Sequence, residues 1–537
     1  MQRQCEAMAD VCATPRTAAG IWQLQSIASI ALALVGASTS NFSFGQEIPT
    51  EGEVAPQRAP LSVQVSSGAT ATYSDNVAPS SGKNESSLVV RLQPSIHAQM
   101  QSSRGFGTLD IGVDHYMYAN DNGLDHTETP LRGTGSLELV DRWLYVDAAA
   151  SIATQTRSVF GTQVADDDVQ GGNRVRTRSF QIAPRIAGMI GGKADYELRI
   201  AQAWSKSNEG ALARGSGART TQLAGKVAGD TTFSWVGWSV LVENSHAGLQ
   251  GVEDSENGRI LANATVRFDP QFRIELSAGH EFDNFSRESQ RNRAVVGAGL
   301  DWAPTERTKL HYRWDTRSFG NSYSFDFSHR TAMTSWTLQT GKGVRLPTQS
   351  LSGINGKSAF DALYAQLAGS IPDPFQRAEA VRDRLDLAGV PANASVSGNF
   401  LSSDPYLESR TSSSIAWVGA QNTVLFGATA AKSQRLGSLG SVFDDFSLSG
   451  VIRQRGSNAS WSYSLSPQSS ITLSGINSRS KGAAGQSSNL KTWTAGYRAK
   501  VGQRTAAGVV LRSTTSDSST GVDYTENALT GTVSVVF

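Results

Sequence analysis

From residue 61 onward the chain alternates apolar and polar positions with a period of two, in runs of about 10–15 residues. The final run is the clearest, because Leu529, Gly531, Val533, Val535 and Phe537 share one side of an extended strand. The other side holds three small polar residues between Ala528 and Val536. One face of such a strand suits an apolar environment and the other suits water. The pattern is typical of a transmembrane β-barrel, although a strand of a soluble sandwich has the same period.

The connections between these runs favour the barrel. Turns containing Gly, Pro, Asn or Asp follow some runs, as at residues 140–143, 269–271 and 501–504, whereas a long polar loop such as residues 160–173 follows others. Short turns at one end of the strands and long loops at the other are the asymmetry of outer-membrane barrels.

Tryptophans lie mostly near the ends of the predicted strands. They are Trp143, Trp204, Trp235, Trp238, Trp302, Trp314, Trp336, Trp417, Trp461 and Trp493. Amphipathic rings at those positions would form the aromatic girdles of a membrane barrel, and the alternative is that they cap the core of a soluble sandwich.

One stretch has a different period. About fourteen strand-like runs precede it and about seven follow it, and an even-numbered barrel needs one more crossing. Its first residues, 341–345, are predicted to form a turn. Further on, Asp373 can cap a helix whose apolar residues follow at three- and four-residue spacing. The stretch is either a helical insert plus one further strand, near residues 396–401, or a plug that crosses the lumen.

The predicted fold is therefore all-β: one transmembrane antiparallel outer-membrane β-barrel of about 20–22 strands with a helical insert. Residues 61–340 form the first part of the barrel, and residues 341–405 form the insert, as a plug or on the periplasmic side. Residues 406–537 form the last part, and its C-terminal strand closes against the first strand near residues 61–73.

The amino-terminal region predicts export. The eleven apolar residues 27–37 are too few to span a bilayer and suit a signal-peptide core. Small residues favour cleavage before Gln46, so residues 1–45 are predicted to be a signal peptide and residues 46–60 a periplasmic lead-in. Both cysteines, Cys5 and Cys12, precede that point. The expected location is the Gram-negative outer membrane, and without a compact domain before the first strand, coupling to an inner-membrane energy protein is not expected.

Composition and sequence motifs give no sign of catalysis, metal binding or nucleic-acid binding. The formal charge of +1 gives no electrostatic reason to bind nucleic acid. The seven histidines do not fall at metal-ligand spacing, and no G-x-S-x-G motif occurs. No catalytic residue, metal or cofactor is predicted, and the chain is expected not to be an enzyme, with an outer-membrane hydrolase as a remote alternative.

Two sets of residues are candidates for function. The closing strand carries a predicted assembly signal for the barrel assembly machinery: Tyr524, Leu529, Val533, Val535 and Phe537. The insert helix carries charged residues that would form a hydrated gate or a docking surface for a periplasmic protein: Asp373, Arg377, Arg382 and Arg384. The alternative for this second set is a solvated helix face.

Several soft motifs resemble a known family. They are Thr-Ala-Thr-Tyr-Ser-Asp-Asn-Val at 70–77, Trp-Ala-Pro-Thr-Glu-Arg-Thr at 302–308, residues 319–330 ahead of Trp336, Ile-Pro-Asp-Pro-Phe-Gln-Arg at 371–377, and residues 524–537. Together they resemble the outer-membrane barrel family associated with the PEP-CTERM/exosortase protein-sorting system, over about residues 60–537. Members occur with exopolysaccharide production machinery, and no catalytic residues come with the family.

The resemblance implies a non-enzymatic conduit or accessory for exopolysaccharide export. Its expected partners are outer-membrane lipid, the barrel assembly machinery, the exopolysaccharide and periplasmic export proteins. The alternatives are a general porin or solute channel, and a structural or adhesion barrel that uses its long outer loops.

Overall fold

The computed structural model describes residues 61–79, 85–120, 122–165, 168–169, 172–207, 217–249, 253–285, 292–346, 405–436 and 444–537, with isolated positions between 364 and 402. Contacts divide the chain into Met1–Ala59 and Pro60–Phe537, and all described residues belong to the second unit. The predicted signal peptide (1–45) and lead-in (46–60) therefore lie outside the described residues.

The described elements are almost all strands. Up to the insert they are β1 (Leu61–Ser74), β2 (Ser87–Ser102), β3 (Gly105–Gly112), β4 (Asp114–Tyr118), the 3-10 helix η2 (Asn122–Leu124), β5 (His126–Glu128), β6 (Leu131–Val140), β7 (Leu144–Thr156), β8 (Arg174–Ile190), β9 (Ala194–Ser207), β10 (Gly217–Asp230), β11 (Val236–Leu249), β12 (Ser255–Asp269), β13 (Phe272–Asp283), β14 (Asn292–Thr305), β15 (Thr308–Arg317), β16 (Gly320–Arg330) and β17 (Thr334–Arg345). After it come β18 (Tyr406–Val418), β19 (Asn422–Arg435), helix α5 (Asp445–Leu448), β20 (Val451–Ser466), β21 (Ser469–Gly482), β22 (Ser487–Lys500), β23 (Thr505–Ser518) and β24 (Tyr524–Val536).

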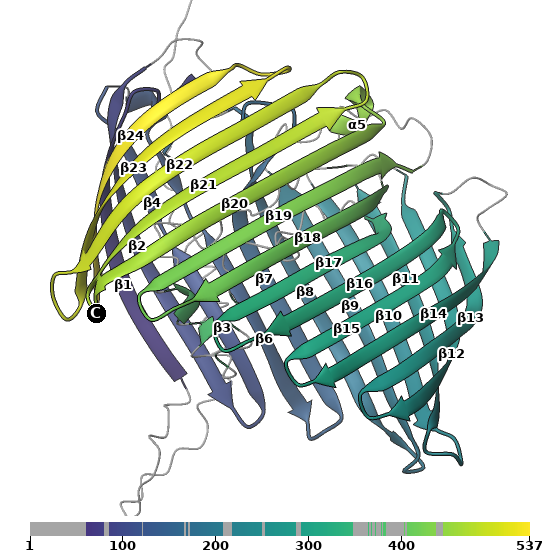
Figure 1. Ribbon diagram of the computed structural model, residues 1–537. Coiled ribbons are helices and arrows are strands. Elements are labelled where there is room, and N and C mark those ends of the chain that lie inside the picture. The colour runs from purple at the N-terminus through teal and green to yellow at the C-terminus, as the bar shows by residue number, and fades with distance from the viewer. Residues whose placement is uncertain are drawn as a thin grey trace, which may run out of the picture. The chain divides into compact units, whose positions relative to one another are not determined.

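These strands form one closed antiparallel barrel of 22 crossings (Figure 1). Both β3 and β4 pair with β2, and β6 and β5 pair with them in turn, so each of these two crossings carries two labels. Pro94 and Pro130 interrupt the pairing there, since proline has no N–H to donate. The predicted outer-membrane barrel is confirmed. The region before the insert holds fifteen crossings, because its seventeen labelled strands include these two divided ones, and not about fourteen.

The last strand closes the barrel against the first, as the sequence predicts. The pairing runs from Ser66 opposite Val536 to Ser74 opposite Ala528. In Figure 1 the C-terminus lies at the end where most short turns are, and α5 lies at the opposite end. By the rule that barrel turns are periplasmic and long loops extracellular, the end that carries α5 is the extracellular mouth.

The period-two pattern separates a lipid face from a lumenal face. On β13, Leu276 is 56% exposed on the outside of the barrel, whereas its neighbour Ser277 is 7% exposed and faces inward. An apolar side chain is stable there only against lipid, which replaces the core of a soluble protein. All the tryptophans predicted for the girdles except Trp314 have exposed rings, and Trp143, Trp302, Trp336, Trp417 and Trp461 lie close to the short turns.

The insert begins later than the sequence predicts. Residues 341–345 continue β17, with Gly341 opposite Arg410 and Arg345 opposite Tyr406, so the predicted turn is wrong. Glycine weakens a strand but still pairs through its backbone, and Arg345 Nε donates to Glu408 Oε2 at 2.8 Å across the pair. Within the insert, the described positions 364, 367, 377, 378 and 380–382 are helical, and residues 396–401 lie outside the described part. No described helix is long and apolar enough to cross a bilayer.

Candidate functional site

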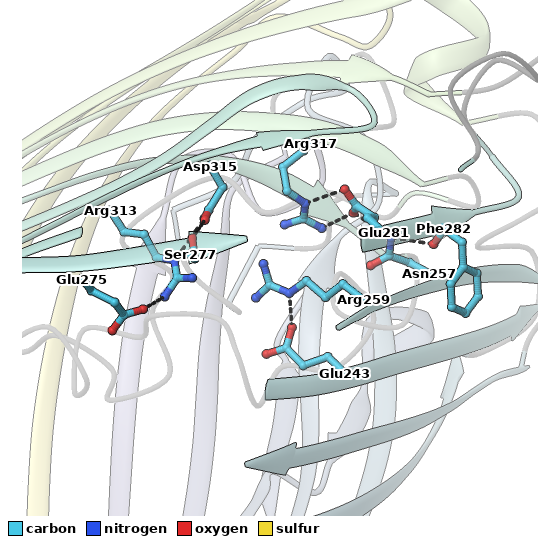
Figure 2. Close-up of polar contacts among 10 residues, drawn as sticks. All are labelled: Glu243, Asn257, Arg259, Glu275, Ser277, Glu281, Phe282, Arg313, Asp315 and Arg317. Atoms are coloured by element: carbon cyan, nitrogen blue, oxygen red, sulfur yellow. Dashed lines mark hydrogen bonds and ion pairs between the residues drawn. The ribbon is translucent and has the colours of Figure 1, made fainter. Parts of the chain in front are cut away.

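The lumenal face of β11 to β15 gathers charged side chains into one surface, which we call the charged wall (Figure 2). Its members are Glu243, Arg259, Glu275, Glu281, Arg313, Asp315 and Arg317. Successive side chains of a strand point to opposite faces. Apolar neighbours such as Ile260 and Leu276 face the lipid, so these charged side chains face the lumen. Charge on one face and apolar groups on the other are what a hydrated lumen requires.

Glu281 is the most enclosed member of the wall, with a side chain that is 0% exposed. Arg317 forms a two-pronged pair with it: Nε donates to Oε2 at 2.8 Å and Nη2 donates to Oε1. Asn257 Nδ2 donates to Oε1 at 3.0 Å, and the Ser318 backbone N–H donates to Oε2 at 3.1 Å. A buried carboxylate needs this number of donors to offset the loss of its water. The Ser318 bond also ties the β15–β16 turn to β13.

A second cluster centres on Arg313. Its Nη1 donates to Glu275 Oε1 at 2.8 Å and its Nε donates to Asp315 Oδ2 at 3.1 Å. Ser277 Oγ donates to Asp315 Oδ1 at 3.3 Å. Nearby, Arg259 Nε donates to Glu243 Oε2 at 2.5 Å. Three guanidinium groups thus face four carboxylates, which leaves the charged wall near neutrality while it offers many donors and acceptors.

Sequence reasoning did not single out the charged wall. A signal was present, because Arg313, Asp315 and Arg317 recur at a spacing of two, and the alternate positions hold no charged residue. That spacing predicts one charged face on the strand. It does not identify the partners, since Glu275 and Glu281 are 38 and 36 residues away from the arginines they bind.

The predicted assembly signal divides between two faces. Leu529, Val533 and Phe537 have exposed side chains on the lipid side, and Val535 shares that side by alternation. Tyr524 is buried on the lumenal side, where its hydroxyl donates to Glu526 Oε2 at 3.1 Å. The recognition of these residues by the assembly machinery stays a prediction.

Of the predicted insert residues, Asp373 and Arg384 lie outside the described part of the chain. Arg377 and Arg382 are partly buried in helical positions, and Arg377 Nε donates to the Ile371 carbonyl at 2.8 Å. The Arg377 guanidinium also lies 4.7 Å from the ring centroid of Tyr364, a cation–π contact. Arg377 therefore holds the insert together internally, and its role in a gate or docking surface stays a prediction.

The insert touches the inner wall of the barrel at β19. Leu367 and Val381 are buried together, with Leu425 packed against them. Leu425 faces the lumen, because the neighbouring Phe426 is exposed on the lipid side. These described positions of the insert therefore contact the lumenal face of β19 near its first residues.

Three of the histidines, His97, His246 and His311, each lie beside one carboxylate. His97 Nδ1 lies 2.6 Å from Asp110 Oδ1, and His311 Nδ1 lies 2.7 Å from Asp301 Oδ1. Within the described ranges, no group of three or more His, Cys, Asp or Glu side chains is placed to hold a metal ion.

Comparisons with known proteins find similar solved structures but no related sequence family. No protein-family model matches the sequence, and no curated protein does. The ferric enterobactin receptor of Pseudomonas aeruginosa matches with a TM-score of 0.45 and 8% identity, over 88% of this chain and 80% of that one. A siderophore receptor of Acinetobacter baumannii matches with a TM-score of 0.42 and 9% identity, over 90% of this chain and 82% of that one. At this level of similarity neither protein assigns a ligand to this chain.

Proposed function

We propose that this outer-membrane barrel is a non-enzymatic conduit or accessory for exopolysaccharide export, associated with the PEP-CTERM/exosortase system. The motifs at residues 70–77, 302–308 and 371–377 support the association with that system. The charged wall supports passage of a hydrated polymer, and it is the observation that carries the proposal.

The chemistry of the wall suits hydroxyl-rich chains. A sugar hydroxyl both donates and accepts, so it exchanges readily with guanidinium donors and carboxylate acceptors that stand side by side. Arg259, Arg313 and Arg317 are each held by a carboxylate of the wall, which reduces the pull of any one group on a passing ligand. A surface of many weak polar contacts favours movement over retention.

Gene deletion tests the proposal. Secreted polysaccharide should fall while total polysaccharide synthesis is unchanged, and the wild-type gene should restore export. Unchanged export in the deletion strain would contradict the proposal and favour the general porin or the structural barrel.

A charge-neutral double variant, Glu275→Gln with Arg313→Gln, tests the wall itself. It removes the two ion pairs of Arg313, with Glu275 and with Asp315, without changing the net charge. A barrel that assembles to the wild-type level should therefore export less polymer. The matched control is Glu306→Gln with Arg307→Gln, in the β14–β15 turn outside the lumen. Equal export by both double variants would show that the wall does not contact the cargo.

A further inference from the structure

Two loops from opposite sides of the barrel meet at the extracellular mouth. One joins β7 to β8, and the other joins β19 to β20 and contains α5. On the shorter path round the barrel, eight crossings separate them, formed by β5/β6, β3/β4, β2, β1, β24, β23, β22 and β21. A contact between these loops therefore spans the mouth.

The contact is both polar and apolar. Ser158 Oγ donates to Asp445 Oδ1 at 2.5 Å, and the Val159 N–H donates to Asp445 Oδ2 at 2.7 Å. Beneath these bonds lies a buried cluster of Val159, Phe160, Tyr406, Phe446 and Ile452. We call this contact the mouth bridge.

The β7–β8 loop is also bonded to strands and a loop on one side of the mouth. Thr162 Oγ1 donates to the Val522 carbonyl at 2.7 Å, beside β24. Farther along, Asp168 Oδ2 accepts from Thr72 Oγ1 of β1 at 2.9 Å, and the Asp168 carbonyl accepts from Tyr118 OH of β4 at 3.0 Å. The described residues of the loop thus bond to α5, to the β23–β24 loop, to β1 and to β4, and none of these bonds reaches the charged wall.

We propose that the mouth bridge is a proton-sensitive latch that closes part of the extracellular mouth, with Asp445 as its switch. The latch would act on any cargo that passes the mouth, so the inference goes beyond the proposed function and can fail independently of it.

The sign of the response follows from burial. Asp445 is 3% exposed, and burial raises the pKa of its carboxyl from 3.8 to about 6, against the lowering effect of the bonds from Ser158 and Val159. In an open mouth the carboxyl would be solvated, with its ordinary pKa. The closed state therefore binds the proton more tightly, and closure is favoured as the pH falls from about 6 towards 3.8.

Protonation is compatible with the geometry. The Ser158 hydroxyl can accept from a protonated carboxyl as well as donate to an ionised one, and the other carboxyl oxygen still accepts from the Val159 N–H. The neighbouring charge that acts on Asp445 is Asp444, which raises its pKa further. The cluster beside Asp445 contains one further titratable group, Tyr406 of β18. The charged groups that act on the Tyr406 ring are Arg345, Glu408 and Arg410.

Solute flux through the full-length protein in phosphatidylcholine vesicles tests the latch. With a small neutral sugar as probe, the ratio of open to closed barrels should be about tenfold lower at pH 5 than at pH 7.5. Asp445→Asn keeps the shape but cannot ionise, so its flux should be low and should not change with pH. Asp141→Asn in the β6–β7 turn is the control and should keep the wild-type response.

A reversible tether supplies a second test that does not depend on titration. In Ser158→Cys with Asp445→Cys, oxidation should hold the mouth closed and lower the flux at every pH, and reduction should restore it. The inference is overturned if wild-type flux is the same at both pH values, if Asp445→Asn retains the pH response, or if oxidation leaves the flux unchanged.

Discussion

On the charged wall, ion-pair partners come from the same strand or from strands one or two places apart. Arg259 of β12 binds Glu243 of the adjacent β11, at a separation of 16 residues. At the mouth bridge, Ser158 and Asp445 are 287 residues apart and belong to opposite sides of the barrel. The wall can form as neighbouring strands pair, whereas the bridge needs a closed barrel. Changes to the wall should therefore act on the whole barrel, and changes to the bridge on the mouth alone.

The largest expected effect comes from Glu281→Ala on the charged wall. It leaves Arg317, Asn257 and the Ser318 N–H without their shared acceptor in an enclosed site. Loss of one partner from such a pair costs about 3–5 kcal/mol. Urea unfolding of the barrel in lipid vesicles, followed by tryptophan fluorescence, should show this loss.

Two variants make that result specific. Glu281→Gln keeps an acceptor and should lose less stability, and Glu306→Ala in the exposed β14–β15 turn should lose almost none. A loss after Glu281→Ala no greater than that of Glu306→Ala would mean that the wall contributes nothing to barrel stability.

The mouth bridge should respond differently to Val159→Ala. This change removes two methyl groups from a side chain that is 3% exposed, at a cost of about 2 kcal/mol to the contact. Because the bridge is separate from strand pairing, we expect faster trypsin cleavage at the exposed Arg157 and an unchanged urea midpoint of the barrel.

The control for the bridge is Val501→Ala, in the exposed β22–β23 turn, which should change neither measurement. A fall in the urea midpoint after Val159→Ala, without faster cleavage, would show that bridge and barrel unfold as one unit.

The difference between contacts of neighbouring strands and contacts across the barrel also explains what the sequence could predict. Alternation on β24 identifies lipid-facing Leu529 and Val533 without knowledge of any partner, since lipid contacts the whole outer face. This is why the barrel, its closing strand and its turns were predictable. The turn expected at residues 341–345 was wrong because a local glycine preference is overridden by pairing with β18.

Partners across the lumen were not predictable, for a physical reason. Alternation places Arg313 on the inner face, but only the strand register brings it to Glu275. The bridge depends further on the path of two loops, for which a single sequence carries no periodic signal. In the sequence Asp445 is one acidic loop residue among many. Only its burial beside Ser158 and Val159 distinguishes it from the others.

The smallest expected effect, Arg259→Gln, separates the electrostatic role of the wall from its structural one. It leaves Glu243 without its guanidinium and adds one negative charge to the lumen. The cation-to-anion permeability ratio should rise a few-fold at low salt and return towards the wild-type value in about 1 M salt, where charges are screened within about 3 Å. Reversal potentials across a planar bilayer under a salt gradient measure this ratio. Arg453→Gln on β20 removes the same charge from an exposed position on the outer side and is the matched control. If both variants shift the reversal potential equally, ions do not pass along the charged wall, and the path through the barrel lies against another part of its inner face.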